Sequence, residues 1–282
     1  MTADNVLFEI KGLKKNFGDL EVLKGIHTTI RKGEVVVVIG PSGSGKSTLI
    51  QHLNGLMKAT SGTIYFHGQD IYEDDFDLRE LRNRVGLVFQ YPEHQLFETT
   101  IFDDVCFGPK NQGLSKEEAG LRAFEALRSV GLPEELYYQS PFDLSGGQKR
   151  RVAIAGVLAM KPEVLILDEP TNHMDIVGKE ALEQMLREYE GTVLFVSHDR
   201  YFISRIATGI LEFSESGVKQ YAMSYEEYLA EKQKEMEISG KGRGMSQSAR
   251  YVSGNDTQNS VGNEKHNQHQ SGIKTDADVP TL

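Results

Sequence analysis

A glycine-rich segment between residues 40 and 47 combines the residue types that can hold a chain of phosphates. It reads GPSGSGKS, which fits the pattern G-x-x-x-x-G-K-S/T at every position. The glycines allow the backbone to wrap around phosphates and to turn successive N–H groups toward them. Lys46 is expected to reach the β- and γ-phosphates, and Ser47 to bind Mg²⁺. The predicted phosphate-binding residues are Gly40, Ser42, Gly43, Gly45, Lys46, Ser47 and Thr48.

Two adjacent carboxylates follow an apolar run further along the chain. Residues 164–167 read VLIL, and Asp168 and Glu169 come directly after them. Acids at the carboxyl end of a parallel strand stand where ligands of α/β proteins bind. We expect Asp168 to hold Mg²⁺ through water. Glu169 is the candidate to orient and deprotonate an attacking water molecule.

A second helix start with small residues lies between these two motifs. Residues 144–148 read LSGGQ and open a helical pattern that continues to Met160. The first N–H groups of a helix have no partner inside it, and small side chains leave them open to an anion. The chain therefore has two separate helix starts that can bind an anion.

Each of the three motifs also has a purely structural interpretation. The first can be a glycine-rich turn with an exposed lysine, and the acids can cap the turn at Pro170. The LSGGQ segment can be an ordinary capped helix start. The combination of all three in one chain favours the chemical interpretation.

Apolar strand patterns and helical patterns alternate along the chain, which predicts a mainly parallel sheet covered by helices. Residues 7–30 predict two or three further strands, and residues 101–138 predict a helical insertion with a capping box at Ser115. The other predicted strands are 35–39, 63–66, 85–89, 164–167 and 192–196; the other predicted helices are 46–56, 148–160, 177–189 and 201–206.

Composition limits the class of protein. The formal net charge of the 282 residues is -10, and Cys106 is the only cysteine. An acidic body argues against direct DNA binding, because phosphate contacts need clustered Lys and Arg. No signal peptide or bilayer-spanning run of about 20 residues is seen, so we expect a protein of the reducing cytosol. The polar composition from Gln233 onward predicts a disordered tail, with residues 1–232 forming one domain.

The order of these motifs resembles the ATP-binding cassette (ABC) ATPases. The resemblance covers residues 6–232 and implies an α/β P-loop fold with an antiparallel β part and a helical subdomain at about residues 91–143. It implies that His198 contacts the γ-phosphate, that Gln90 senses Mg²⁺ and the attacking water, and that Phe17 stacks on adenine. Each residue has an alternative interpretation. His198 can be structural, Gln90 can be a solvated loop amide, and Phe17 can pack in the core.

The same resemblance implies a head-to-tail dimer. ATP would lie between the phosphate loop of one subunit and Ser145, Gly146, Gly147 and Gln148 of the other, with Asp175 beside this shared site. Bound ATP–Mg²⁺ would close the dimer and hydrolysis would loosen it. Both half-sites are present in one chain, so the second subunit is predicted to be another copy.

Three segments resemble three branches of the family. Residues 9–55 are similar to ATPases of polar amino-acid importers, residues 91–170 to energy-coupling-factor ATPases, and residues 171–232 to ABC-F proteins, which act on ribosomes. This sequence of likenesses suggests a mosaic, natural or engineered.

The transporter interpretation is the preferred one. ABC-F proteins usually have two cassettes joined by a long helical linker, and this chain has one cassette without that linker. Tyr91, Leu96 and Phe97 are apolar residues at an expected surface turn, where importers receive a helix of the membrane subunit; burial is the alternative. We therefore expect an importer ATPase bound peripherally to the inner face of the cell membrane, with a ribosome-associated or uncoupled ATPase as the alternatives.

Overall fold

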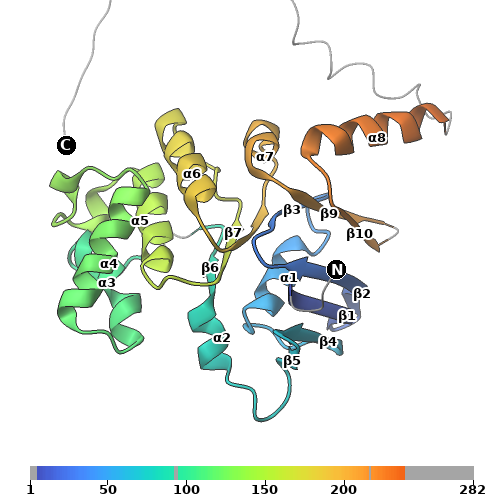
Figure 1. Cartoon of the computed structure of the whole chain (residues 1–282), viewed down its shortest axis with the longest axis horizontal. Helices are drawn as coiled ribbons and strands as arrows, with labels where there is room; N and C mark the ends of the chain where they lie inside the picture. The colour runs from blue at the N-terminus through green and yellow to red at the C-terminus, as the bar shows by residue number, and fades with distance from the viewer. Residues whose placement is uncertain (1–4, 92–94, 216, 239–282) are drawn as a thin grey trace, which may run out of the picture. The chain divides into compact units, whose positions relative to one another are not determined.

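A six-stranded sheet forms the centre of the protein (Figure 1). The computed structural model describes residues 5–91, 95–215 and 217–238. The strand order is β10-β9-β3-β8-β7-β6, with every neighbouring pair parallel except β9 and β10. Its strands are β3 (Val35–Ile39), β6 (Val85–Val88), β7 (Val164–Asp168), β8 (Thr192–Val196), β9 (Gly209–Ser214) and β10 (Gly217–Tyr221).

Apolar side chains explain the position of the central strands. Every residue of β6, β7 and β8 is buried, as expected for a parallel sheet that is covered on both faces. All the parallel strands end at the same edge of the sheet, so the loops that follow β3, β7 and β8 lie close together.

A second sheet is antiparallel and consists of strands from the first 70 residues. Its order is β2-β1-β4-β5, and its strands are β1 (Val6–Phe17), β2 (Leu20–Arg31), β4 (Ser61–Phe66) and β5 (Gln69–Asp70). One hydrophobic core joins this sheet to a face of the central sheet and to α1 (Lys46–Leu53). This core supports the turn between β3 and α1.

Three helices form the insertion between β6 and β7. They are α3 (Ile101–Asn111), α4 (Lys116–Ser129) and α5 (Gly146–Leu158), which pack on one another and share a core with the other face of the sheet. The short turns η3 (Glu134–Leu136) and η4 (Pro141–Asp143) connect α4 to α5. The predicted capping box at Ser115 is present, because its side chain and that of Glu118 bond each other's backbone N–H.

The remaining helices are α2 (Leu78–Arg84), α6 (Ile176–Glu188), α7 (Arg200–Ile206) and α8 (Tyr225–Ile238). The predicted α/β class, with a mainly parallel sheet, an antiparallel part and a helical insertion, is confirmed. Helix α8 continues past Gln233 to Ile238, and residues 239–282 of the predicted tail lie outside the described residues. In the described ranges, no helix has both the length and the apolar character to cross a membrane.

Candidate functional site

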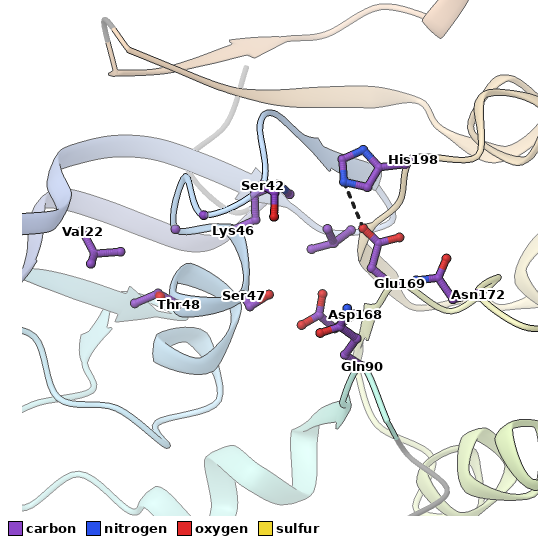
Figure 2. Close-up of a pocket in the computed structure, with 13 residues that line it drawn as sticks. Val22, Ser42, Lys46, Ser47, Thr48, Gln90, Asp168, Glu169, Asn172 and His198 are labelled. Atoms are coloured by element: carbon purple, nitrogen blue, oxygen red, sulfur yellow. Dashed lines mark ion pairs between the residues drawn. The ribbon is translucent and has the colours of Figure 1, made fainter. Parts of the chain in front are cut away.

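A cavity of about 600 Å³ lies where the loops after β3, β7 and β8 meet (Figure 2). Its lining combines cationic, acidic and small residues from segments that are far apart in the sequence. The lining residues are Val22, Ser42, Gly43, Gly45, Lys46, Ser47, Thr48, Gln90, Asp168, Glu169, Asn172, Val196 and His198. The structure thus brings most of the predicted catalytic and phosphate-binding residues together.

Glycine is required at two positions of the phosphate loop. Gly40 has φ of +145°, and a Cβ there would stand 2.6 Å from the carbonyl oxygen of Phe213. Gly45 has φ of +98°, precedes α1, and would place a Cβ 2.9 Å from a methyl carbon of Leu23. Larger residues would therefore displace the loop in which the backbone N–H groups gather.

The ammonium group of Lys46 turns back onto this loop. Its Nζ donates to the carbonyl oxygens of Gly40, at 2.9 Å, and Pro41, at 2.8 Å. Burial lowers the pKa of Lys46, whereas the nearby charges of Glu169 and Asp168 raise it. The buried hydroxyl of Ser44 has no hydrogen-bond partner among the described residues. A cation and an unsatisfied hydroxyl in a glycine cradle fit a phosphate chain.

Asp168 is the last residue of β7 and is buried beside the start of α1. Burial raises the pKa of its carboxyl, while a hydrogen bond from Ser47 and the charge of Lys46 lower it. The hydroxyl oxygen of Ser47 and the carboxylate of Asp168 suit Mg²⁺, which binds through one or two protein oxygens together with substrate phosphates. The described residues contain no cluster of three or more His, Cys, Asp and Glu that could hold a metal.

Glu169 and His198 form an ion pair at the edge of the cavity. His198 Nε2 lies 3.3 Å from Glu169 Oε1, and the histidine side chain is 60 % exposed (Figure 2). Burial raises the pKa of Glu169, the charge of His198 lowers it, and the charge of Asp168 raises it further. A carboxylate with a raised pKa, next to a site for phosphates, is suited to accept a proton from water.

Three lining residues were not predicted as site residues. One of them is Val196, the last residue of β8. Val22 lies on β2 and packs near Gly45, while Asn172 follows the acidic pair in the loop before α6. Nothing in the type of Val22 distinguishes it from a core valine. The amide of Asn172, three residues after Glu169, is a signal that could have found it.

Phe17 does not line the cavity. It ends β1, is 48 % exposed, and its ring lies 5.2 Å from the ammonium nitrogen of Lys15. The core alternative for Phe17 is therefore wrong, whereas its contact with adenine stays a prediction. Gly40 also lies outside the lining and contributes its carbonyl to Lys46.

The LSGGQ segment and Asp175 lie outside this cavity as well. Ser145 caps α5, because its backbone N–H donates to Gln148 Oε1 at 2.9 Å and its hydroxyl accepts from the N–H of Gln148 at 3.3 Å. Asp175 caps α6 by accepting from the N–H of Gly178 at 2.8 Å. Gly146 is exposed at the helix start. Both capped starts leave the role of these residues toward a second subunit as a prediction.

The strand, the phosphate loop and the acidic pair define a P-loop nucleoside triphosphatase. A family model described as ABC transporter matches residues 23–172. The energy-coupling factor transporter ATP-binding protein EcfA2 of Caldanaerobacter subterraneus subsp. tengcongensis is 53 % identical over 193 residues, which cover 67 % of this chain and 68 % of that protein.

Two solved structures have the same fold. The structure of cbiO1 from Clostridium perfringens, part of the ABC transporter complex cbiONQ, has a TM-score of 0.72 at 36 % identity and covers 83 % of this chain and 95 % of its own. The dimeric post-hydrolysis ATP-binding cassette MJ0796, bound to ADP and Pi, has a TM-score of 0.69 at 31 % identity, with 77 % and 99 % covered. The chain belongs to the ABC transporter family, and it is an ATPase.

Proposed function

We propose that this chain is the ATP-hydrolysing subunit of an importer of the energy-coupling-factor type. The cavity that joins the phosphate loop to Asp168, Glu169, Gln90 and His198 is the observation that carries the proposal. The similarity to the relative named EcfA2 supports this type of transporter. It agrees with the resemblance of residues 91–170 to energy-coupling-factor ATPases. Mg²⁺ is part of the proposal, on the basis of the oxygens of Ser47 and Asp168.

Each residue has a proposed role in hydrolysis. The loop N–H groups and Lys46 bind the phosphates, and Mg²⁺ bound with ATP would neutralise their charge. Ser47 and Asp168 would hold the ion, and Gln90 would orient the attacking water. Glu169 accepts the proton of that water, while His198 holds the Glu169 carboxylate in place and faces the γ-phosphate. Catalysis here consists of positioning and electrostatic stabilisation.

A second ATPase subunit completes the site in this proposal. The helix start at Ser145, Gly146, Gly147 and Gln148 lies outside the chain's own cavity. The N–H groups of Ser145 and Gln148 are bonded within the capping box, so in this proposal those of Gly146 and Gly147 face the ATP of a partner. The dimeric cassette MJ0796 supports such an arrangement. We infer a dimer of identical subunits, because this chain contains both halves of the shared site.

The membrane contact is proposed at the loop after β6. Tyr91 and Phe97 are 53 % and 57 % exposed, and the ring of Phe97 stands edge-on to that of Phe107 at 4.8 Å. Exposed aromatic residues of this kind suit a helix of a membrane subunit. The expectation that Leu96 joins this surface is wrong, since it is 8 % exposed and packs in the core with Ile101. The proposed location is the cytoplasmic face of the cell membrane, bound from the side.

A ribosome-associated function remains the second candidate, on the basis of the wording of residues 171–202 alone. The relatives named above are transporter proteins and lend it no support.

The test is a pull-down with the Glu169→Gln protein from solubilised membranes, with ATP–Mg²⁺ and without nucleotide. The proposal expects hydrophobic membrane subunits to copurify with the variant. Lys46→Ala, which should bind ATP weakly, is the matched control for nucleotide dependence. ATP-dependent cosedimentation with ribosomes, in place of membrane subunits, would reverse the ranking of the two functions.

A further inference from the structure

Arg150 is a buried cation that faces the catalytic loops from the helical insertion. It belongs to α5, and 2 % of its surface is exposed. A guanidinium group is always charged and has five N–H donors in a rigid fork, so its burial requires acceptors at fixed places. Backbone carbonyls of three separate positions provide them.

All three acceptors belong to residues that line the cavity. Arg150 Nη1 donates to the carbonyl oxygen of Glu169 at 2.9 Å and to that of Asn172 at 2.6 Å. Its Nη2 donates to the carbonyl oxygen of Gln90. One side chain of α5 therefore joins the loop after β6 to the loop after β7.

The backbone of Glu169 needs such support. Glu169 has φ of +50°, a left-handed conformation that non-glycine residues adopt only when neighbours hold them in it. Its N–H donates to the carbonyl oxygen of Val196 at 3.0 Å, and its own carbonyl accepts from Arg150. Because the peptide groups before and after Glu169 are both hydrogen-bonded, the carboxylate keeps its direction toward His198.

We propose that Arg150 is a positioning residue that fixes the loops of Gln90, Glu169 and Asn172 relative to α5. The helix begins at Gly146, about one turn before Arg150, so a shift of the helix start moves both loops through the same guanidinium. Arg150 thereby links the LSGGQ segment of a subunit to that subunit's own hydrolytic residues. This inference rests on the proposed roles of Gln90 and Glu169.

Arg151 is a matched control on the same helix. It is also buried, at 7 % exposure, and its Nη1 donates to the carbonyl oxygen of Gly131 at 2.7 Å and to that of Val130 at 3.5 Å. These acceptors lie at the end of α4, away from the cavity. Arg151→Lys therefore reports what the loss of a buried arginine fork does to the helical insertion alone.

The experiment compares Arg150→Met, Arg150→Lys and Arg151→Lys in the full chain by amide hydrogen exchange and by phosphate release. Both Arg150 variants should speed exchange about tenfold in peptides that contain residues 90–91 and 169–172, because these loops lose their shared anchor. Their kcat should fall about 100-fold while the Kd for ATP stays within about threefold. Arg151→Lys should change exchange near Gly131 and leave kcat within about threefold of the parent.

The proposal is overturned if exchange in the two loops stays at the parent's rate, or if Arg151→Lys speeds it equally. It is also overturned if kcat of a folded Arg150 variant stays within twofold of the parent. Arg150→Lys keeps the charge and serves if the Met variant does not fold. Glu169→Gln is measured alongside to separate the catalytic role of Glu169 from the positioning role of Arg150. If this variant hydrolyses ATP at the parental rate, the role of Glu169 is contradicted, while the exchange data still test Arg150.

Discussion

At the scale of single residues, the site concentrates charge where water is scarce. Asp168 and Glu169 are both buried, and burial raises the pKa of each carboxyl above its ordinary value. Lys46 is buried opposite them, with a pKa that burial lowers. Desolvation favours the neutral form of every one of these groups. Such a site is poorly satisfied until a ligand of matching charge enters, which explains how it can bind a phosphate chain and a cation together.

The role of Glu169 predicts the effect of its amide variant on turnover. Glu169→Gln keeps the shape of the side chain but cannot accept a proton, so kcat should fall at least about 100-fold, as expected for a lost general base. ATP affinity should stay near that of the parent, because Lys46 and the loop N–H groups are unchanged. Phosphate release and nucleotide titration measure the two quantities. Glu135→Gln, at an exposed carboxyl in η3, is the control, and equal turnover in both variants contradicts the role.

The raised pKa of Glu169 also predicts how stability depends on pH. A carboxyl whose pKa is higher in the folded state binds its proton more tightly there, so its contribution to stability is lost as pH rises from the unfolded to the folded pKa. Glu169→Gln removes this loss and should raise Tm at neutral pH. The gain should shrink as pH falls from the folded pKa toward about 4.3, the pKa of an unfolded glutamate, and should be absent below it. Nucleotide-free thermal unfolding over a pH series tests this, and a gain that grows as pH falls contradicts it.

At the scale of elements, most of the strands and helices that the sequence could predict were identified by runs of apolar residues. Strands β7 and β8 are buried throughout, so their uninterrupted apolar pattern identified them and, with them, the loops of Asp168 and His198. Helix α2 was missed because its seven residues are mostly polar and only Leu81 is buried. The mostly polar strand β10 and helix α8 were missed for a similar reason. Strand β9 was missed although Ile210, Leu211 and Phe213 are buried, because Glu212 interrupts its short apolar run.

Tertiary contacts explain the parts of the site that no local pattern could predict. Arg150 follows LSGGQ in a polar stretch, where an arginine is ordinarily exposed, and only the packed fold shows its three carbonyl acceptors. Val22 lines the cavity because strand β2 passes the phosphate loop, which lies 18 to 25 positions further along the sequence. The chemistry was thus predictable from motifs, whereas the neighbours that hold it depend on the whole fold.

The turn between β3 and α1 allows a prediction at this scale. Gly40→Ala places a Cβ 2.6 Å from the Phe213 carbonyl, so the phosphate loop must shift and ATP affinity should fall more than about tenfold. Gly33→Ala is the control: its φ of +76° is also left-handed, but no atom lies within 4 Å of the added Cβ. Both variants should lower Tm, whereas nucleotide titration should separate them. Equal ATP affinity in the two would show that the loop does not depend on Gly40.

At the scale of the whole molecule, the phosphate-binding cavity and the LSGGQ helix start lie at separate places in one chain. The cavity collects the phosphate loop, Asp168, Glu169 and His198, while the start of α5 and Asp175 lie outside it. A head-to-tail dimer explains this separation, because each half then faces the complementary half of the other subunit. The alternative, in which Ser145 only caps α5, also agrees with its hydrogen bonds to Gln148.

Ser145→Arg places a large side chain at the helix start that is proposed to face the partner's ATP. The variant should lose hydrolysis, whereas ATP binding to its own phosphate loop should stay largely intact. Ser115→Arg is the matched control, since Ser115 is an exposed serine that caps α4 with the same capping box.

The stronger test mixes Ser145→Arg with Lys46→Ala, two variants that are each expected to be inactive. In a mixed dimer the intact phosphate loop of one subunit meets the intact LSGGQ of the other, so one site is complete. If subunits exchange freely and sites act independently, turnover should return to about a quarter of the parental value. A mixture that stays inactive although mixed dimers form contradicts the shared site, and parental turnover by Ser145→Arg alone shows that the serine serves only as a cap.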